Sequence, residues 1–102
     1  MDTKQLKEIF SKIDISDNEH HLQIIHSKDL KEMFYGNYFE NDISLEVEFL
    51  VYGHFTTLSN FKLDEIQVKR VDFWLDDYTE YKLNSIENEL LLNTLYDKVK
   101  SL

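Results

Sequence analysis

The sequence predicts an α+β fold, in which a small antiparallel β-sheet is packed by an N-terminal and a C-terminal helix. Apolar residues recur at helical spacing near both ends, over residues 2–13 and 84–100, and alternate with polar residues over residues 44–52. Strands flanked by terminal helices favour a sheet that is covered on one face. With 102 residues, the chain is expected to form one acidic domain over its whole range, 1–102.

The first predicted element is a helix over residues 2–13. Its apolar residues repeat on one face, and lysines and Glu8 take the other. Asp2 or Thr3 is suited to cap its first turn. The stretch 14–20 that follows is polar and predicts a loop.

A short strand and a short helix are predicted next. Alternation over residues 22–26 predicts the strand. The apolar spacing within residues 27–36 predicts one or two helical turns, with Gly36 as their C-terminal stop. Residues 37–42 then predict a turn-rich connector.

The strongest strand pattern covers residues 44–52, where apolar side chains alternate with Glu46, Glu48 and others. Gly53 predicts a bulge or bend before a continued strand over residues 54–58. Ser59-Asn60 predicts the turn that follows.

The last third of the chain predicts a second long strand and the closing helix. Apolar residues over 66–75 change phase in the middle, which predicts a bulge near Lys69-Arg70. Residues 76–81 predict a connector. Asn84-Ser85-Ile86-Glu87 forms a capping box, which predicts a helix from there to about Lys100.

Composition and charge exclude several classes of protein. The chain has no Cys, which excludes disulfide frameworks and thiolate zinc sites. We expect no signal peptide and no membrane span, because no apolar run has the required length or flanks. The net charge of −9 disfavours direct binding to nucleic acid and anionic membranes, and permits a basic protein partner. The predicted location is the cytoplasm of a bacterial host cell, and the predicted state is a monomer or small homo-oligomer.

The histidines form the first candidate for chemistry, as ligands of a metal. They are His20, His21, His26 and His54. Their spacing matches no known zinc pattern and no HExxH helix is present. We therefore expect no metal and no cofactor.

Paired carboxylates form the second candidate, for acid–base catalysis. Such pairs occur at Glu46 and Glu48 and at Asp76 and Asp77. A domain of this size offers little room for a deep cleft, and no nucleophile elbow or phosphate loop is present. The prediction is a protein that is not an enzyme and has no catalytic residues.

Acidic and aromatic residues gather where basic residues are missing, since no Lys or Arg stands between Lys31 and Lys62. A second acidic and aromatic run covers residues 72–81. Exposed aromatic rings supply binding area and carboxylates pair with arginine, so such a surface suits a basic protein. The candidate partner-binding residues are Tyr35, Tyr38, Phe39, Glu40, Asp42, Glu46, Glu48, Asp72, Trp74, Asp76, Asp77 and Tyr78.

A simpler interpretation of the same residues stays open at this point. The aromatic side chains can fill a small core in a chain that has no Ala and no Cys, while the acidic residues form its solvated face. Which interpretation holds depends on where the strands place these side chains.

Three segments carry a resemblance to known proteins: residues 44–55 (SLEVEFLVYGHF), residues 64–77 (DEIQVKRVDFWLDD) and the helix from Asn84. Their layout resembles the small acidic proteins encoded by phages and prophages of AT-rich bacteria, some of which are anti-CRISPR proteins or similar host-defence inhibitors. The resemblance implies a non-enzymatic inhibitor that binds a basic nucleic-acid-handling protein, such as a CRISPR effector nuclease. It contains no family motif, so it assigns no functional residue.

Two alternatives share this acidic surface. One is an immunity protein that neutralises a toxin nuclease. The other is a phage structural or assembly accessory protein. Gene context separates the inhibitor from the immunity protein, and a large closed ring in solution favours the assembly protein.

Overall fold

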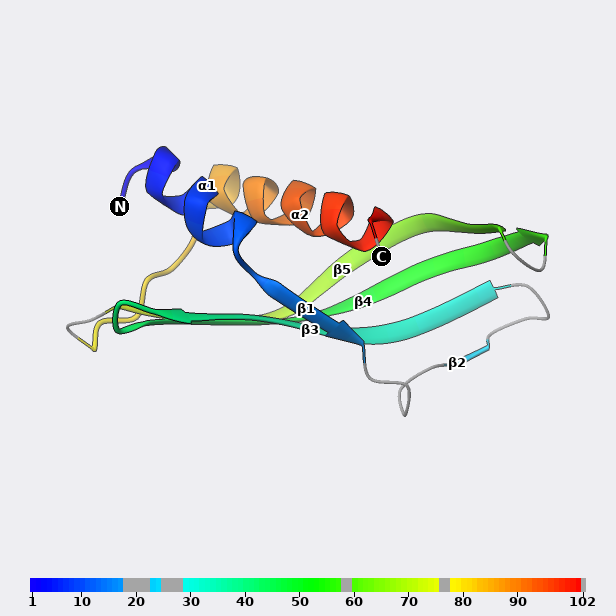
Figure 1. Cartoon of the computed structure of the whole chain (residues 1–102), viewed down its shortest axis with the longest axis horizontal. Helices are drawn as coiled ribbons and strands as arrows, with labels where there is room; N and C mark the ends of the chain where they lie inside the picture. The colour runs from blue at the N-terminus through cyan, green and yellow to red at the C-terminus, as the bar shows by residue number, and fades with distance from the viewer. Residues whose placement is uncertain (18–22, 25–28, 58–59, 76–77, 102) are drawn as a thin grey trace.

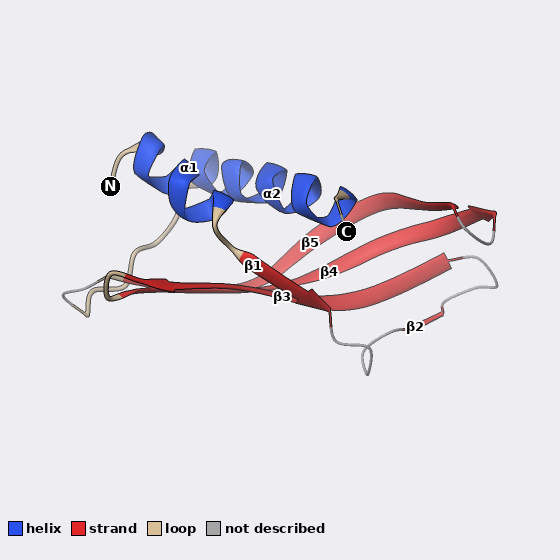
Figure 2. Cartoon of the chain, in the orientation of Figure 1, coloured by secondary structure: helices blue, strands red, loops and turns tan. Residues whose placement is uncertain are grey.

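A computed structural model of the chain describes residues 1–17, 23–24, 29–57, 60–75 and 78–101. The predicted α+β fold is confirmed: an antiparallel sheet is packed by an N-terminal and a C-terminal helix (Figure 2). The elements are α1 (Thr3–Ser11), β1 (Asp14–Asp17), β2 (Gln23–Ile24), β3 (Asp29–Glu40), β4 (Ile43–Thr57), β5 (Asn60–Trp74) and α2 (Ser85–Lys100).

The sheet is built mainly from one meander. Its strand order is β1-β3-β4-β5, with β2 paired to β3 off this path, and every pairing is antiparallel. The turn between β3 and β4 is Asn41-Asp42, flanked by the Glu40–Ile43 pair. Both turn residues have positive φ, 53° and 61°, which is the type I′ geometry that a two-residue hairpin favours.

Both helices lie on one face of this sheet and leave the other face open (Figure 1). The strands are longer than the helical layer, so β3, β4 and β5 continue past the C-terminal end of α2. The molecule measures 48 × 24 × 20 Å and its radius of gyration is 14.8 Å. A compact chain of this length has a radius of gyration of about 13 Å, so the overhanging strands make the domain elongated.

The hydrophobic core lies between the helices and the sheet. Alternation in β4 sends Leu45, Val47, Phe49 and Val51 to the helices, and each is at most 3% exposed, as the sequence predicts. Other elements contribute Leu6, Ile9, Phe10, Ile13, Phe34, Tyr38, Ile66, Phe73, Leu91, Leu95 and Val99.

Both helices begin with the reciprocal hydrogen bonds of a capping box. In α1, Asp2 pairs with Gln5. In α2, the predicted box of Asn84 and Glu87 is confirmed, with donor–acceptor distances of 2.8 and 3.0 Å. Each box satisfies backbone N–H groups that a helix start leaves unpaired.

Two irregularities in the pairing of β4 with β5 confirm the predicted bulges. The register shifts between Tyr52 and Gly53, and again between Glu48 and Phe49. At the second shift Glu48 pairs with Arg70 and Phe49 pairs with Val68, which leaves Lys69 as the extra residue. This bulge restores alternation, so the apolar residues on both sides of it reach the core.

The predicted helical turns over residues 27–36 are wrong, because Asp29–Glu40 is one continuous strand. Part of the predicted connector 37–42 belongs to the same strand. Gly36 therefore stops no helix: it is a buried mid-strand residue, and a Cβ on it would lie 2.8 Å from Ile13 Cγ2. Pairing with β4 along its whole length overrides the local helical spacing.

The predicted loop over residues 14–20 is also wrong in its first part, where Asp14–Asp17 forms β1. Backbone hydrogen bonds to β3 hold this edge strand despite its polar side chains. The predicted strand 22–26 coincides with β2 at residues 23–24. The rest of these two segments lies outside the described residues, as do Leu58 of the predicted strand 54–58 and Ser59 of the predicted turn. Asn60, the other residue of that predicted turn, begins β5.

Candidate functional site

The sheet face opposite the helices carries six of the twelve predicted partner-binding residues. Strand pairing arranges them in three neighbouring rows, each with one residue from β3, β4 and β5. We call these nine residues the acidic-aromatic face. Its rows are Phe39, Ser44 and Trp74; Asn37, Glu46 and Asp72; and Tyr35, Glu48 and Arg70.

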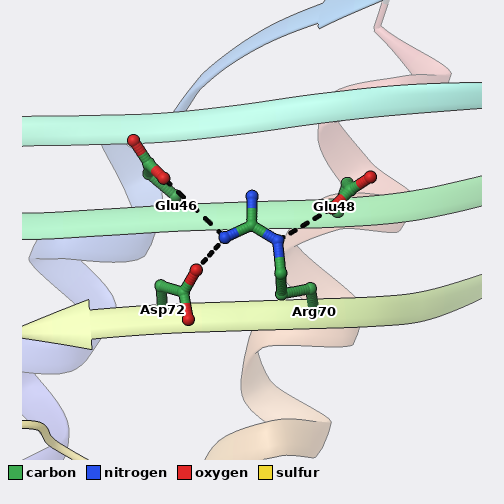
Figure 3. A network of polar contacts seen from close by, with 4 residues as sticks. All are labelled: Glu46, Glu48, Arg70 and Asp72. Atoms are coloured by element: carbon green, nitrogen blue, oxygen red, sulfur yellow. Dashed lines mark hydrogen bonds and ion pairs between the residues drawn. The ribbon is translucent and has the colours of Figure 1, made fainter.

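The side chain of Arg70 lies at the centre of this face (Figure 3). Its Nε donates a hydrogen bond to Glu48 Oε2 at 2.8 Å. Its Nη1 forms an ion pair with Asp72 and lies 3.8 Å from Glu46 Oε2. The hydrogen bond to Glu48 raises the pKa of the Arg70 guanidinium, so the group is positively charged throughout the physiological range.

The charges of this cluster do not cancel. Glu46 and Asp72 are direct cross-strand partners, and like charges in such positions repel. Arg70 offsets that repulsion, yet three carboxylates against one guanidinium leave two negative charges on a small exposed area. The sheet thus holds a local excess of negative charge on a rigid backbone.

Aromatic rings flank this charge and are open to solvent. Phe39 is 56% exposed and Trp74 is 43% exposed. Farther along the chain, Tyr78 is 91% exposed and has φ of 61°. Positive φ is costly for a bulky residue, and the ring of Tyr78 buries little area in return. Residues with strained backbone cluster at functional sites, which keeps Tyr78 a candidate for binding.

Besides Tyr78, three described residues of the prediction lie outside this face. Tyr38 alternates to the helix side, is 7% exposed and belongs to the core, so it does not join the acidic-aromatic face. Glu40 is exposed and its Oε2 lies 3.9 Å from Lys12 Nζ of the segment after α1. Asp42 occupies the β3–β4 turn. Asp76 and Asp77 lie outside the described residues.

The histidine candidates are not brought together in the part of the chain that is described. His54 Nδ1 lies 2.8 Å from Asp64 Oδ2, an exposed pair on the overhanging strands. His20, His21 and His26 lie outside the described residues. Among the described side chains, no group of three His, Asp or Glu residues is placed to hold a metal ion.

Two important residues of the face were not among those predicted from the sequence. Arg70 is the one arginine of the chain, and Asn37 fell in a predicted connector. The predicted bulge at Lys69-Arg70 was the available signal for Arg70, because a bulge re-aims a side chain. Asn37 carries no such signal, because its place on the face depends on β3 being a strand.

A shallow hollow of about 290 Å³ opens on the acidic-aromatic face. It is lined by Tyr35, Asn37, Phe39, Glu46 and Arg70, together with Gly36 and Val47. Its volume lies just below the range for small-molecule pockets, which begins at about 300 Å³. It has the size to receive one side chain of a partner.

Comparison with protein-family models, curated proteins and solved structures finds no match to this chain. None of the described helices is long and apolar enough to cross a membrane.

Proposed function

We propose that this chain is a non-enzymatic inhibitor that binds a basic nucleic-acid-handling protein, such as a CRISPR effector nuclease, through the acidic-aromatic face. One observation carries the proposal. Glu46, Glu48 and Asp72 lie together on the uncovered side of a sheet. The exposed rings of Phe39 and Trp74 lie in the row next to Glu46 and Asp72.

The chemistry of a nucleic-acid groove supports this choice of partner. Such a groove presents Lys and Arg to hold phosphates. A surface that carries net negative charge on fixed strands is complementary to it, and blocks it without any catalytic step. Aromatic residues add the desolvated contact area that makes a charged interface tight.

The geometry also favours binding over catalysis at this face. The carboxylates of Glu46 and Glu48 lie beside Arg70 on the uncovered sheet face, with side chains 47% and 26% exposed. A general acid works best in a desolvated pocket that shifts its pKa. An open charged surface instead steers a partner of opposite charge.

The experiment measures inhibition directly. A panel of purified CRISPR effector nucleases, each loaded with its guide RNA, is assayed for DNA cleavage with and without this protein. We expect at least one nuclease to be bound and inhibited. The triple variant E46Q/E48Q/D72N should weaken that binding at least tenfold, because it removes the three carboxylates of the face.

A matched control separates the face from bulk charge. The variant E8Q/E89Q/D97N also removes three negative charges, all at exposed helix positions. It should bind within about twofold of the wild type. Equal losses in the two variants, or no inhibition by the wild type across the panel, would contradict the proposal. Binding should also fall steeply in high salt, since the screening length drops from about 10 Å at 0.1 M to about 3 Å at 1 M.

A further inference from the structure

The hollow on the acidic-aromatic face has one carboxylate with spare hydrogen-bonding capacity. The Nε–H of Arg70 donates a hydrogen bond to Glu48, and its Nη1 forms an ion pair with Asp72. The distance from Arg70 Nη1 to Glu46 Oε2, 3.8 Å, is too long for a hydrogen bond. The guanidinium therefore acts on Glu46 as a neighbouring charge, and within the described part of the chain the Glu46 oxygens stay available to another donor.

Two aromatic rings stand on either side of that carboxylate. Glu46 pairs directly with Asn37 of β3. Tyr35 and Phe39 are two residues before and two residues after Asn37, so both are diagonal neighbours of Glu46 on the same sheet face. Diagonal neighbours are about 7–8 Å apart, within reach of aromatic side chains. Both rings line the hollow with Glu46.

We infer that this hollow receives an arginine side chain of the basic partner, whose guanidinium pairs with Glu46 and stacks on the ring of Phe39 or Tyr35. A guanidinium is planar and donates two parallel hydrogen bonds to a carboxylate. It also stacks on aromatic rings, whereas a lysine ammonium is a compact, strongly hydrated charge. The remaining negative charge of Glu48 and Asp72 offsets the repulsion from Arg70.

The inference rests on the proposed function for the identity of the partner, but it can be tested without that partner. The probes are two peptides of equal charge, a glycine-spaced tetra-arginine and a glycine-spaced tetra-lysine. Each is titrated into the isotopically labelled full chain and followed by amide NMR. We expect the arginine peptide to bind at least threefold more tightly and to shift the amide signals of Asn37, Phe39 and Glu46.

Three variants locate the binding. E46Q and Phe39→Ala should each lower the affinity for the arginine peptide at least threefold. Glu65→Gln removes an exposed carboxylate from β5 in a different row of the sheet, opposite Tyr52, and should change the affinity by less than twofold. All three variants should keep the wild-type amide spectrum away from the substitution, which shows that the fold is intact.

Equal affinity for the two peptides would overturn the inference, because it would show simple charge attraction. So would shifts confined to another part of the molecule, or an equal loss in E65Q and E46Q. These outcomes leave the proposed function standing if a nuclease is still inhibited through the face. Conversely, if the chain binds the arginine peptide selectively but inhibits no nuclease, the inference about the hollow stands and the proposed inhibitor function is rejected.

Discussion

The hydroxyl oxygen of Tyr96 accepts a hydrogen bond from the backbone N–H of Ile66 at 2.9 Å. Tyr96 lies on α2 and Ile66 lies on β5, the last strand in the sheet order. The edge of a sheet presents N–H groups that can pair with another chain. One side chain of the helical layer thus satisfies a backbone donor of β5 and joins α2 to the sheet.

Replacing Tyr96 by Phe should lower the free energy of unfolding by about 1 kcal/mol, because the Ile66 N–H loses its partner. Urea unfolding followed by circular dichroism measures this. Tyr78→Phe is the matched control, since the ring of Tyr78 is 91% exposed, and it should leave stability unchanged. A loss in Y78F as large as that in Y96F would show that the Tyr96 hydrogen bond is not the cause.

Adding a methyl group at Gly36 should destabilise the fold by about 1–3 kcal/mol, because the new Cβ would lie 2.8 Å from Ile13 Cγ2. The substitution is Gly36→Ala and the measurement is again urea unfolding. The same substitution in an Ile13→Ala background should cost less, since the crowded methyl group is gone. Additive losses in the double-mutant cycle would place the strain elsewhere.

The β3–β4 turn should gain stability from Asp42→Gly, because Asp42 has φ of 61° and glycine adopts that conformation at no steric cost. We expect a gain of about 0.5–1 kcal/mol. Asp42→Ala removes the same carboxylate but keeps a Cβ, so it should not stabilise. If both variants are equally stable, charge and not backbone conformation determines the effect.

Glu87 should make part of the stability depend on pH. The backbone N–H of Asn84 and the hydroxyl of Tyr81 both donate to its carboxylate, which lowers the pKa of Glu87. A lowered pKa means that the charged form stabilises the fold above the usual glutamate value of 4.5, and that this contribution is lost as the pH falls through the folded-state value.

The measurement compares wild type with Glu87→Gln in urea at several pH values. The wild type should be more stable by about 1 kcal/mol at pH 7, and the difference should vanish at the acid end of the titration. A difference that is constant with pH would assign the effect to the capping hydrogen bonds alone. Asp97→Asn, at an exposed position of α2, serves as the control for a lost carboxylate.

The parts of the fold that the sequence predicted are those with a clear period and a buried face. Residues of α1 and the first half of β4 show one apolar side and one polar side, and α2 is marked by its capping box, so these predictions agree with the structure. The phase change in β5 was visible because a bulge shifts apolar residues by one position. Local pattern and global packing agree in these elements.

The sequence pattern does not predict β3 as a strand, for a physical reason that also concerns the candidate site. Its helix side carries Phe34 and Tyr38, and its open side carries Tyr35 and Phe39. Apolar and aromatic residues on both faces remove the alternation that marks a half-buried strand. The exposed rings that make the face a binding candidate are therefore also what concealed the strand.

Because the sequence pattern does not predict β3 as a strand, it also groups two residues of the candidate site wrongly. Tyr38 and Phe39 are adjacent in sequence and point to opposite faces once β3 is a strand. Without that knowledge both were predicted to bind a partner. The contact of Arg70 with Glu48 joins residues on two strands across a bulge, so it depends on register, which the sequence pattern left undetermined.

The order of elements along the chain has a consequence for synthesis. β3, β4 and β5 follow one another in the chain, and β4 pairs with both of its sequence neighbours, so these three strands can pair from their turns soon after each leaves the ribosome. α1 precedes these strands in the chain and α2 follows them. Until α2 leaves the ribosome, the part of the apolar sheet face that α2 covers stays exposed, and in that interval the nascent chain is most prone to aggregation and to chaperone capture.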